Sequence, residues 1–279
     1  MTTRALGGIW DAVEAWLGRF SFRAKLAVVW ALIFAGLAVV FAAFRFDTEF
    51  MLEWLPFLLK GVPLTLLISV LGIVLAVPLA LVAALARLSR NPLLNGVSGF
   101  YISFIRGTPL IVQIFFIYLA LPQLATYAPE SLSQLFILGS VTSGVLALGL
   151  NYGAYMAEIF RAGIQSVGHG QIEAAHALGM TGMQTTRRIV LPQAIRVIIP
   201  PTGNEFIAML KDSSLLGVVG VQELFFRASK IGRQYFHSLE TLVVAAIIYW
   251  IITSILTYFQ AKLERRMATG YVRERPNGH

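Results

Sequence analysis

The sequence predicts an all-α polytopic membrane protein. Hydrophobic residues make up 57% of its 279 residues and charged residues 13%, about half the charged share of a typical soluble domain. So few charges cannot cover a water-exposed surface, and so many apolar residues exclude a disordered chain. Uncharged windows recur along the chain with the length of about 20 residues that a helix needs to cross a bilayer core. The absence of cysteine excludes disulfides and thiolate metal sites.

We predict six spans, five from continuous apolar windows and one from an interrupted apolar stretch. In chain order they are 26–44, 61–86, 101–122, 131–157, the interrupted stretch 193–226, and 241–261. The apolar part of the first span is longer than the roughly 7–15 residues of a secretory signal. We therefore expect an uncleaved anchor helix, although Phe41-Ala42-Ala43 leaves a cleaved signal as the alternative.

The distribution of Lys and Arg predicts that both ends of the chain are cytoplasmic, because basic residues concentrate in cytoplasmic loops. Five cationic residues fall in the predicted outer loops, and Lys211 lies within a span. The inner loops and tail carry sixteen, namely Arg4, Arg19, Arg23, Lys25, Arg87, Arg90, Arg106, Arg161, Arg187, Arg188, Arg196, Lys262, Arg265, Arg266, Arg273 and Arg275. The net charge of +8 then reflects the cytoplasmic face of a membrane protein and does not indicate a nucleic-acid partner.

The longest inner loop, 158–192, predicts two short helices. The first covers 171–178 and ends before Gly179, which tolerates the positive φ of a helix C-terminal cap. The second begins at Thr181, with Gln184 as its capping-box partner. Pro192 predicts the turn into the next span. Two capped helices joined by a bend form a knob, which either fits a groove on another protein or lies on the lipid headgroups.

A motif in this loop resembles the EAA loop of bacterial ABC importer permeases. It reads Glu173-Ala174-Ala175, three residues, Gly179, nine residues, Ile189, one residue, Leu191-Pro192. In that family the loop forms the coupling helices that dock on the ATP-hydrolysing subunit. The resemblance therefore implies an ATPase-coupling role for Glu173, Ala174, Ala175, Gly179, Ile189, Leu191 and Pro192.

Three other stretches are similar to one branch of that family, the polar amino-acid permeases. They are Arg106-Gly107-Thr108-Pro109-Leu110, the run from Tyr155 to Ile164, and Lys211-Asp212-Ser213-Ser214-Leu215. The resemblance covers residues 55–262 and implies the transmembrane domain of a type I ABC importer. We divide the chain into an amphipathic cytoplasmic N-terminus (1–25), an extra transmembrane helix with its outer loop (26–54), this five-helix domain (55–262) and a basic cytoplasmic tail (263–279).

The resemblance also implies the partners of the chain. We expect the chain itself not to be an enzyme. The sequence has no G-x-x-x-x-G-K-[ST] phosphate loop, so ATP and Mg would be bound by a partner ABC ATPase homodimer and this chain would hold no cofactor. We further expect an extracytoplasmic amino-acid-binding protein, a second permease subunit (itself or a paralogue) and surrounding lipid in a bacterial cytoplasmic membrane. The main alternative is a self-contained secondary transporter, which the lack of internal sequence symmetry disfavours. No metal site is expected, because the four histidines lie in loops or the tail.

Polar residues within spans are costly and usually face a bundle interior or a water-filled cavity. Asn151, Tyr155 and Glu158 share one helix face at i, i+4 and i+7. They either line a translocation path or form hydrogen bonds between helices, with Glu158 reaching interfacial water. Thr65 and Ser69 either offer hydroxyls to a substrate or bond back to their own helix.

The interrupted span carries the densest group of polar residues. The run Pro200-Pro201-Thr202-Gly203-Asn204 predicts a break or bend, because proline removes a backbone donor and clashes with the preceding turn. Asn204, Glu205, Lys211 and Asp212 then either meet a zwitterionic substrate at the break or serve structure, with a Lys211–Asp212 ion pair locking two helices or closing an outer gate.

Overall fold

The computed structural model describes residues 21–267, and all regular secondary structure within that range is helical. Most of the predicted amphipathic N-terminus and the end of the predicted basic tail lie outside the described residues. The chain forms two compact units, residues 1–50 and residues 51–279. The first unit contains α2 (Phe22–Phe44), which is capped by the Ser21 hydroxyl and has no buried side chain.

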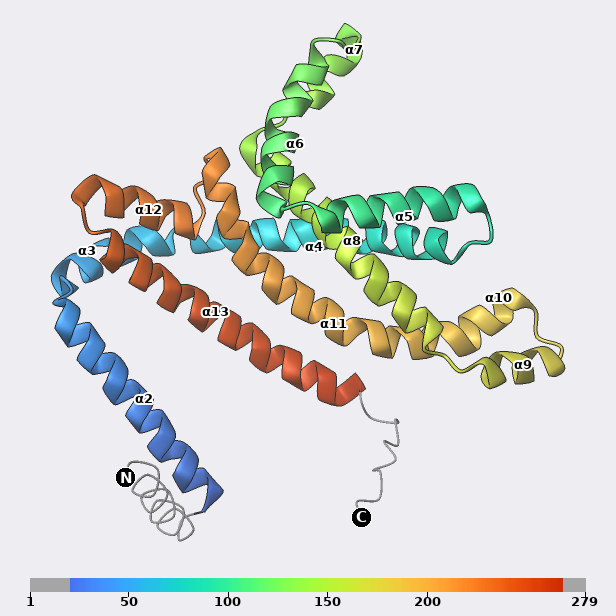
Figure 1. Ribbon diagram of the computed structural model, residues 1–279, viewed down its shortest axis with the longest axis horizontal. Coiled ribbons are helices and arrows are strands. Elements are labelled where there is room, and N and C mark those ends of the chain that lie inside the picture. The colour runs from blue at the N-terminus through green and yellow to red at the C-terminus, as the bar shows by residue number, and fades with distance from the viewer. Residues whose placement is uncertain (1–20, 268–279) are drawn as a thin grey trace, which may run out of the picture. The chain divides into compact units, whose positions relative to one another are not determined.

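The second unit is built around α4 (Val62–Leu88) and α8 (Ser140–Gln165). Small residues let these two helices approach closely: a Cβ on Gly149 would lie 2.5 Å from the Leu75 side chain. The other long helices of this unit are α5 (Pro92–Gly107), α6 (Leu110–Ala125), α11 (Leu191–Asp212) and α13 (Ser238–Met267), as Figure 1 shows. Its shorter helical segments are α3 (Thr48–Leu59, which begins in the first unit), α7 (Glu130–Ser133), α9 (His169–Ala177), α10 (Gly182–Thr185), α12 (Leu224–Tyr235) and the 3₁₀ turns Gln134–Phe136 and Ser213–Val219.

Three helices in residues 21–267 are long and apolar enough to cross a membrane: α2, α4 and α13. The bent pair α5 and α6 makes a fourth when it is counted as one span. α8 and α11 are also long enough, at about 1.5 Å per residue, but they carry polar side chains on their inward faces. The structure thus supports a polytopic helical membrane protein.

The predicted single helix over 101–122 is wrong, because the chain breaks there at Thr108 and Pro109. α5 and α6 meet at an angle of 108° (Figure 1). Pro109 has no amide hydrogen and holds Thr108 in an extended conformation, with φ −116° and ψ 144°. The Gln113 amide donates to the carbonyls of Ile105 at 2.7 Å and Thr108 at 3.1 Å, which satisfies acceptors freed by the break.

The predicted break at 200–204, for which a bend was the alternative, is wrong, since α11 is continuous through both prolines. The Gln260 amide donates to the Pro200 carbonyl at 2.6 Å, and the Thr202 hydroxyl donates to the Ile198 carbonyl at 2.8 Å. Neither bond reaches the carbonyls of Arg196 and Val197, which lose their helical donors to the two prolines.

Several predicted boundaries differ from the structure. α8 begins nine residues after the predicted start at 131 and continues through Glu158 to Gln165. α13 likewise extends to Met267, beyond the predicted start of the tail at 263. Pro192 marks no turn: a π-helical turn, Thr186–Val190, joins α10 directly to α11.

The predicted knob is confirmed. α9 is followed by Gly179, whose φ of 76° lies in the left-handed region that glycine tolerates. Thr181 caps α10, and its side chain and that of Gln184 form the complete capping box. Glycine and one capping box therefore define the bend between the two short helices (Figure 1).

Candidate functional site

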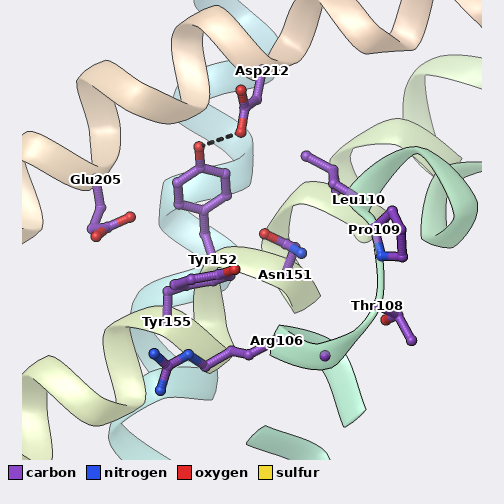
Figure 2. Close-up of a pocket in the computed structure, with 10 residues that line it drawn as sticks. Arg106, Thr108, Pro109, Leu110, Asn151, Tyr152, Tyr155, Glu205 and Asp212 are labelled. Atoms are coloured by element: carbon purple, nitrogen blue, oxygen red, sulfur yellow. Dashed lines mark hydrogen bonds between the residues drawn. The ribbon is translucent and has the colours of Figure 1, made fainter. Parts of the chain in front are cut away.

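A cavity of about 480 Å³ lies where the break between α5 and α6 meets α8 and α11 (Figure 2). Residues from all four helices line it. They are Arg106, Gly107, Thr108, Pro109 and Leu110 at the break, Asn151, Tyr152 and Tyr155 on α8, and Glu205 and Asp212 on α11. The cavity therefore combines irregular backbone with titratable side chains inside a membrane protein, and irregular backbone is tolerated at such depth where protein or a water-filled cavity surrounds it.

Asn151 ties the central helix α8 to the break. Its side-chain amide donates to Gln113 Oε1 at 3.0 Å, and both side chains are buried. Gln113 in turn donates to the carbonyls of Ile105 and Thr108. This chain of hydrogen bonds fixes the position of the break relative to α8, which holds the cavity open at that point.

Two carboxyl groups face the cavity from α11. Glu205 and Asp212 are seven residues apart, so they lie on the same face of the helix. The Tyr152 hydroxyl donates to Asp212 Oδ2 at 2.8 Å, as Figure 2 shows. Among residues 21–267 no hydrogen-bond donor contacts the Glu205 side chain. A cationic group entering the cavity would therefore find the Glu205 carboxyl group available.

Arg106 lines the cavity from the end of α5, and Figure 2 shows its guanidinium on the other side of the Tyr155 ring from Asp212. Its guanidinium carbon lies 5.2 Å from the centre of the Tyr155 ring, a cation–π contact. It is the only cationic residue among those that line the cavity. The lining thus includes one guanidinium and two carboxyl groups, which could pair with the two charged ends of a zwitterion.

The structure brings four of the nine predicted path residues together at this cavity: Asn151, Tyr155, Glu205 and Asp212. Glu158 lies on the same face of α8 as Asn151 and Tyr155, but it forms an ion pair with Arg161 at 2.7 Å.

The remaining predicted path residues lie elsewhere. Asn204 is exposed and donates to Glu264 at 3.4 Å. Lys211 lines a separate groove that includes Tyr249 and Trp250. No ion pair joins Lys211 to Asp212 in the described part of the chain, and Asp212 instead accepts the hydrogen bond from Tyr152.

Thr65 and Ser69 are fully buried and line no part of this cavity. The Ser69 hydroxyl donates to the Thr65 carbonyl at 2.8 Å, one turn earlier on the same helix. The Thr65 hydroxyl accepts from the Leu224 amide at 3.2 Å and lies beside Glu223. Both hydroxyls therefore have protein partners.

Sequence reasoning missed three members of the site: Arg106, Tyr152 and Gln113. The sequence analysis places Arg106 among the cytoplasmic charges and in a family motif but not in the path, and Tyr152 lies outside the i, i+4, i+7 stripe. A signal is present in the sequence, since Thr108-Pro109, two residues after Arg106, interrupts an apolar stretch and marks a broken helix. No group of three or more His, Asp or Glu side chains within residues 21–267 is arranged to hold a metal ion.

The predicted coupling residues lie on the knob and at the start of α11. Glu173, Ala174, Leu191 and Pro192 are exposed, whereas Ala175 is buried and Ile189 is half-buried. Two large apolar side chains beside them are also open to solvent: Leu178 is 82% exposed and Met183 is 76% exposed. The knob thus presents an apolar surface with one carboxylate.

A continuous helical bundle, a polar cavity at a broken helix and an exposed knob define a membrane transport component. The family described as "binding-protein-dependent transport system inner membrane component" matches residues 76–269, and the chain belongs to it. The probable amino-acid permease protein YxeN of Bacillus subtilis (strain 168) is 40% identical over 225 residues, covering 81% of this chain and 97% of that protein. The glutamine transport system permease protein GlnP of Escherichia coli (strain K12) is 39% identical over 223 residues, covering 80% of this chain and 98% of that protein.

A solved structure supports the same assignment. A crystal structure of an amino acid ABC transporter with histidines matches with a TM-score of 0.70 and 37% sequence identity, covering 79% of this chain and 98% of that one. The resemblance to ABC importer permeases is therefore confirmed at the level of family and fold. All regular secondary structure among the described residues is helical, and the chain is a permease subunit of an ABC importer.

Proposed function

We propose that this chain is the transmembrane subunit through which an ABC importer takes up a polar amino acid across a bacterial cytoplasmic membrane. The observation that supports this function most directly is the cavity at the break between α5 and α6. There Arg106, Glu205 and Asp212 line a cavity of about 480 Å³, which is within the usual size range of small-molecule sites.

Each end of an amino acid has a partner in the cavity. A guanidinium binds a carboxylate with two hydrogen bonds, and a carboxylate accepts from an ammonium group. Arg106 would bind the substrate carboxylate and Asp212 its α-ammonium group. Glu205 would remain available, so the cavity favours an amino acid whose side chain carries a second positive charge.

The exposed knob supports coupling to a separate ATPase. Glu173, Ala174, Leu178 and Met183 would dock on an ABC ATPase homodimer that binds ATP and Mg, while Gly179 sets the bend between the two knob helices. The remaining coupling residues, Ile189, Leu191 and Pro192, lie where the knob continues into α11. This continuity supports alternating access, in which closure of the ATPase pair moves α11.

The proposed topology has six spans with both ends cytoplasmic. α8 and α11 would be the two spans beyond those recognised by apolarity alone, and their polar faces would be covered within the subunit pair. One chain offers a cavity open on one side, so we include a second permease subunit (this chain or a paralogue) and an extracytoplasmic amino-acid-binding protein. The alternative function is a secondary transporter that works without these partners.

Reconstitution distinguishes the two functions. The chain is purified with the ATPase and binding protein found in neighbouring reading frames and placed in proteoliposomes. We expect uptake of labelled arginine or lysine that requires the binding protein and internal ATP. Uptake by the chain alone, driven by an ion gradient and independent of ATP, would instead establish the secondary transporter.

A further inference from the structure

α11 connects the knob to the cavity without a flexible loop. The path from Gly182 to Asp212 is helical at every residue, through α10, the π-helical turn Thr186–Val190 and α11. Glu205 and Asp212 lie on its far part and line the cavity. A displacement applied to the knob is therefore transmitted along one helical element toward the two carboxyl groups.

Two polar contacts join this element to α13, and the buried one is made by Gln260. Gln260 on α13 is only 7% exposed, and its Nε2 donates to the Pro200 carbonyl at 2.6 Å. Its side chain occupies the space beside Gly203, where any Cβ would overlap the Gln260 amide. Glu264, one turn further along α13, accepts from Gln260 at 3.2 Å and from Asn204 at 3.4 Å.

The contact lies where α11 resists bending least. Pro200 and Pro201 have no amide hydrogens, so the carbonyls of Arg196 and Val197 lose their usual helical donors. Sharp bends in helices occur at such positions. Gln260 therefore holds α11 at its weakest point, between the knob on one side and Glu205 with Asp212 on the other.

We propose that Gln260 is the pivot of α11, a positioning residue that turns movement of the knob into movement of Glu205 and Asp212. A hydrogen bond to a carbonyl oxygen accepts a broad range of directions, so the contact persists while α11 tilts. Holding the helix at 200–203 makes the parts before and after it move in opposite directions. This inference rests on the proposed function, because the movement of the knob is attributed to the partner ATPase.

Spin-label distances in the assembled importer test the pivot, and the absence of cysteine lets labels be placed freely. Exposed Ser254 on α13 is the reference label, through Ser254→Cys. It is paired either with Met183→Cys on the knob or with Val218→Cys just beyond α11, and both of these positions are exposed. In the complex with ATPase and binding protein in lipid nanodiscs, ATP with vanadate should change both distances.

Two substitutions on opposite sides of the contact should have the same effect. Gln260→Met keeps the side-chain length but removes the donor, and Gly203→Ala displaces the amide. In each variant we expect ATP still to change the distance between positions 254 and 183. We expect the ATP-dependent change in the distance between positions 254 and 218 to be lost. The double variant Gly203→Ala with Gln260→Ala restores space without restoring the hydrogen bond, so it should also lack the change at 218.

The matched controls are a Gln→Met and a Gly→Ala replacement at positions away from the contact between Gln260 and α11. Gln234→Met changes an exposed residue of α12, and Gly36→Ala adds a Cβ where no atom lies within 4 Å. Both should behave as the unmodified chain. A preserved change at 218 in both Gln260→Met and Gly203→Ala overturns the pivot, as does a restored change in the double variant. If position 183 of the unmodified complex does not respond to ATP, the proposed coupling function fails, and the pivot fails with it.

Discussion

At the residue scale, the cavity distinguishes two carboxyl groups on the same helix face. Asp212 accepts a hydrogen bond from Tyr152, whereas Glu205 has no donor among the described residues. Asp212 is therefore held in one position by the protein, and Glu205 is available to a ligand. This difference makes Glu205 the residue that we expect to determine selectivity for side-chain charge.

We predict that Glu205→Gln weakens uptake of cationic amino acids and leaves neutral ones nearly unaffected. A hydrogen bond to a charged group contributes about 2 kcal/mol, so the KM for arginine or lysine should rise by more than about tenfold. Competition assays in proteoliposomes measure the effect on cationic and on neutral amino acids separately. Glu53→Gln, at an exposed position of α3, is the control, and an equal loss for neutral substrates would contradict the assignment.

Glu223 is the most completely buried acidic residue described outside the cavity, with no exposed surface. It caps α12 by accepting from the amides of Phe225 at 2.9 Å and Phe226 at 2.7 Å. The Tyr249 hydroxyl donates to it from α13 at 2.6 Å. The carboxyl group thus joins the start of α12 to α13 and, through Thr65, to α4.

Glu223→Ala should therefore destabilise the fold. It leaves two partly buried backbone amides and one hydroxyl without an acceptor, and the expected loss is about 3 kcal/mol. Thermal unfolding of the purified chain measures it, with Glu53→Ala at an exposed site as the comparison. Equal unfolding temperatures for Glu223→Ala and Glu53→Ala would show that the hydrogen bonds of Glu223 contribute nothing to stability.

At the element scale, the knob depends on the conformation of one glycine. Gly179 has a φ of 76°, and no atom lies within 4 Å of the position that a Cβ would occupy. The cost of a side chain there is therefore backbone strain and not a steric clash.

We predict that Gly179→Ala changes the angle between α9 and α10 and lowers assembly with the ATPase. The left-handed conformation costs a residue with a side chain about 1 kcal/mol, too little to unfold the chain. Co-purification of the ATPase and ATP-driven uptake are the measurements, and Glu173→Ala should lower both as well. Gly182→Ala, where φ is not positive and space is open, is the control. Normal uptake by both Gly179→Ala and Glu173→Ala would contradict the coupling role.

The two proline-containing segments show how context decides what proline does to a helix. Pro109 ends one helix and starts another, because Thr108 before it is extended and Gln113 satisfies the freed carbonyls. Pro200 and Pro201 leave α11 continuous, although the carbonyls of Arg196 and Val197 lose their helical donors. Proline therefore ends a helix at one place in this chain and is tolerated within a helix at another.

At the scale of the whole molecule, residues 51–267 contain their own buried clusters. One cluster includes Ile68 on α4, Leu148 on α8 and Met209 on α11, and the other includes Leu58 and Leu224. None of the side chains of α2 is buried. The first unit therefore contributes no residue of α2 to the core.

A chain shortened to begin at Asp47 should keep its fold, because it retains all of α3 and the bond from the Phe50 amide to Asp47. Since α2 buries no side chain, the free energy of unfolding should change by less than about 0.5 kcal/mol. Thermal unfolding and ATPase co-purification of the shortened chain, compared with the full chain under the same conditions, measure this. A large drop in the unfolding temperature would show that residues 1–46 stabilise the second unit.

The sequence by itself determined the features that depend on local chemistry. Apolar windows predicted α2, α4 and α13, because crossing a bilayer requires a continuous run of apolar residues. Gly179, Thr181 and Gln184 predicted the bend of the knob, because each capping interaction joins residues at most five positions apart. The EAA motif and its companions predicted the family.

Only the tertiary structure decided which polar residues meet. The sequence predicted a break or bend at 200–204 and left a Lys211–Asp212 ion pair as one of two alternatives, whereas the structure has the helix break at Thr108 and Pro109 and joins Asp212 to Tyr152. The polar contact at Pro200 likewise comes from a distant segment, since Gln260 is 60 positions from Pro200. Arg106, Glu205 and Asp212 likewise share a cavity because α5, α8 and α11 pack together, a contact that no local pattern in the chain encodes.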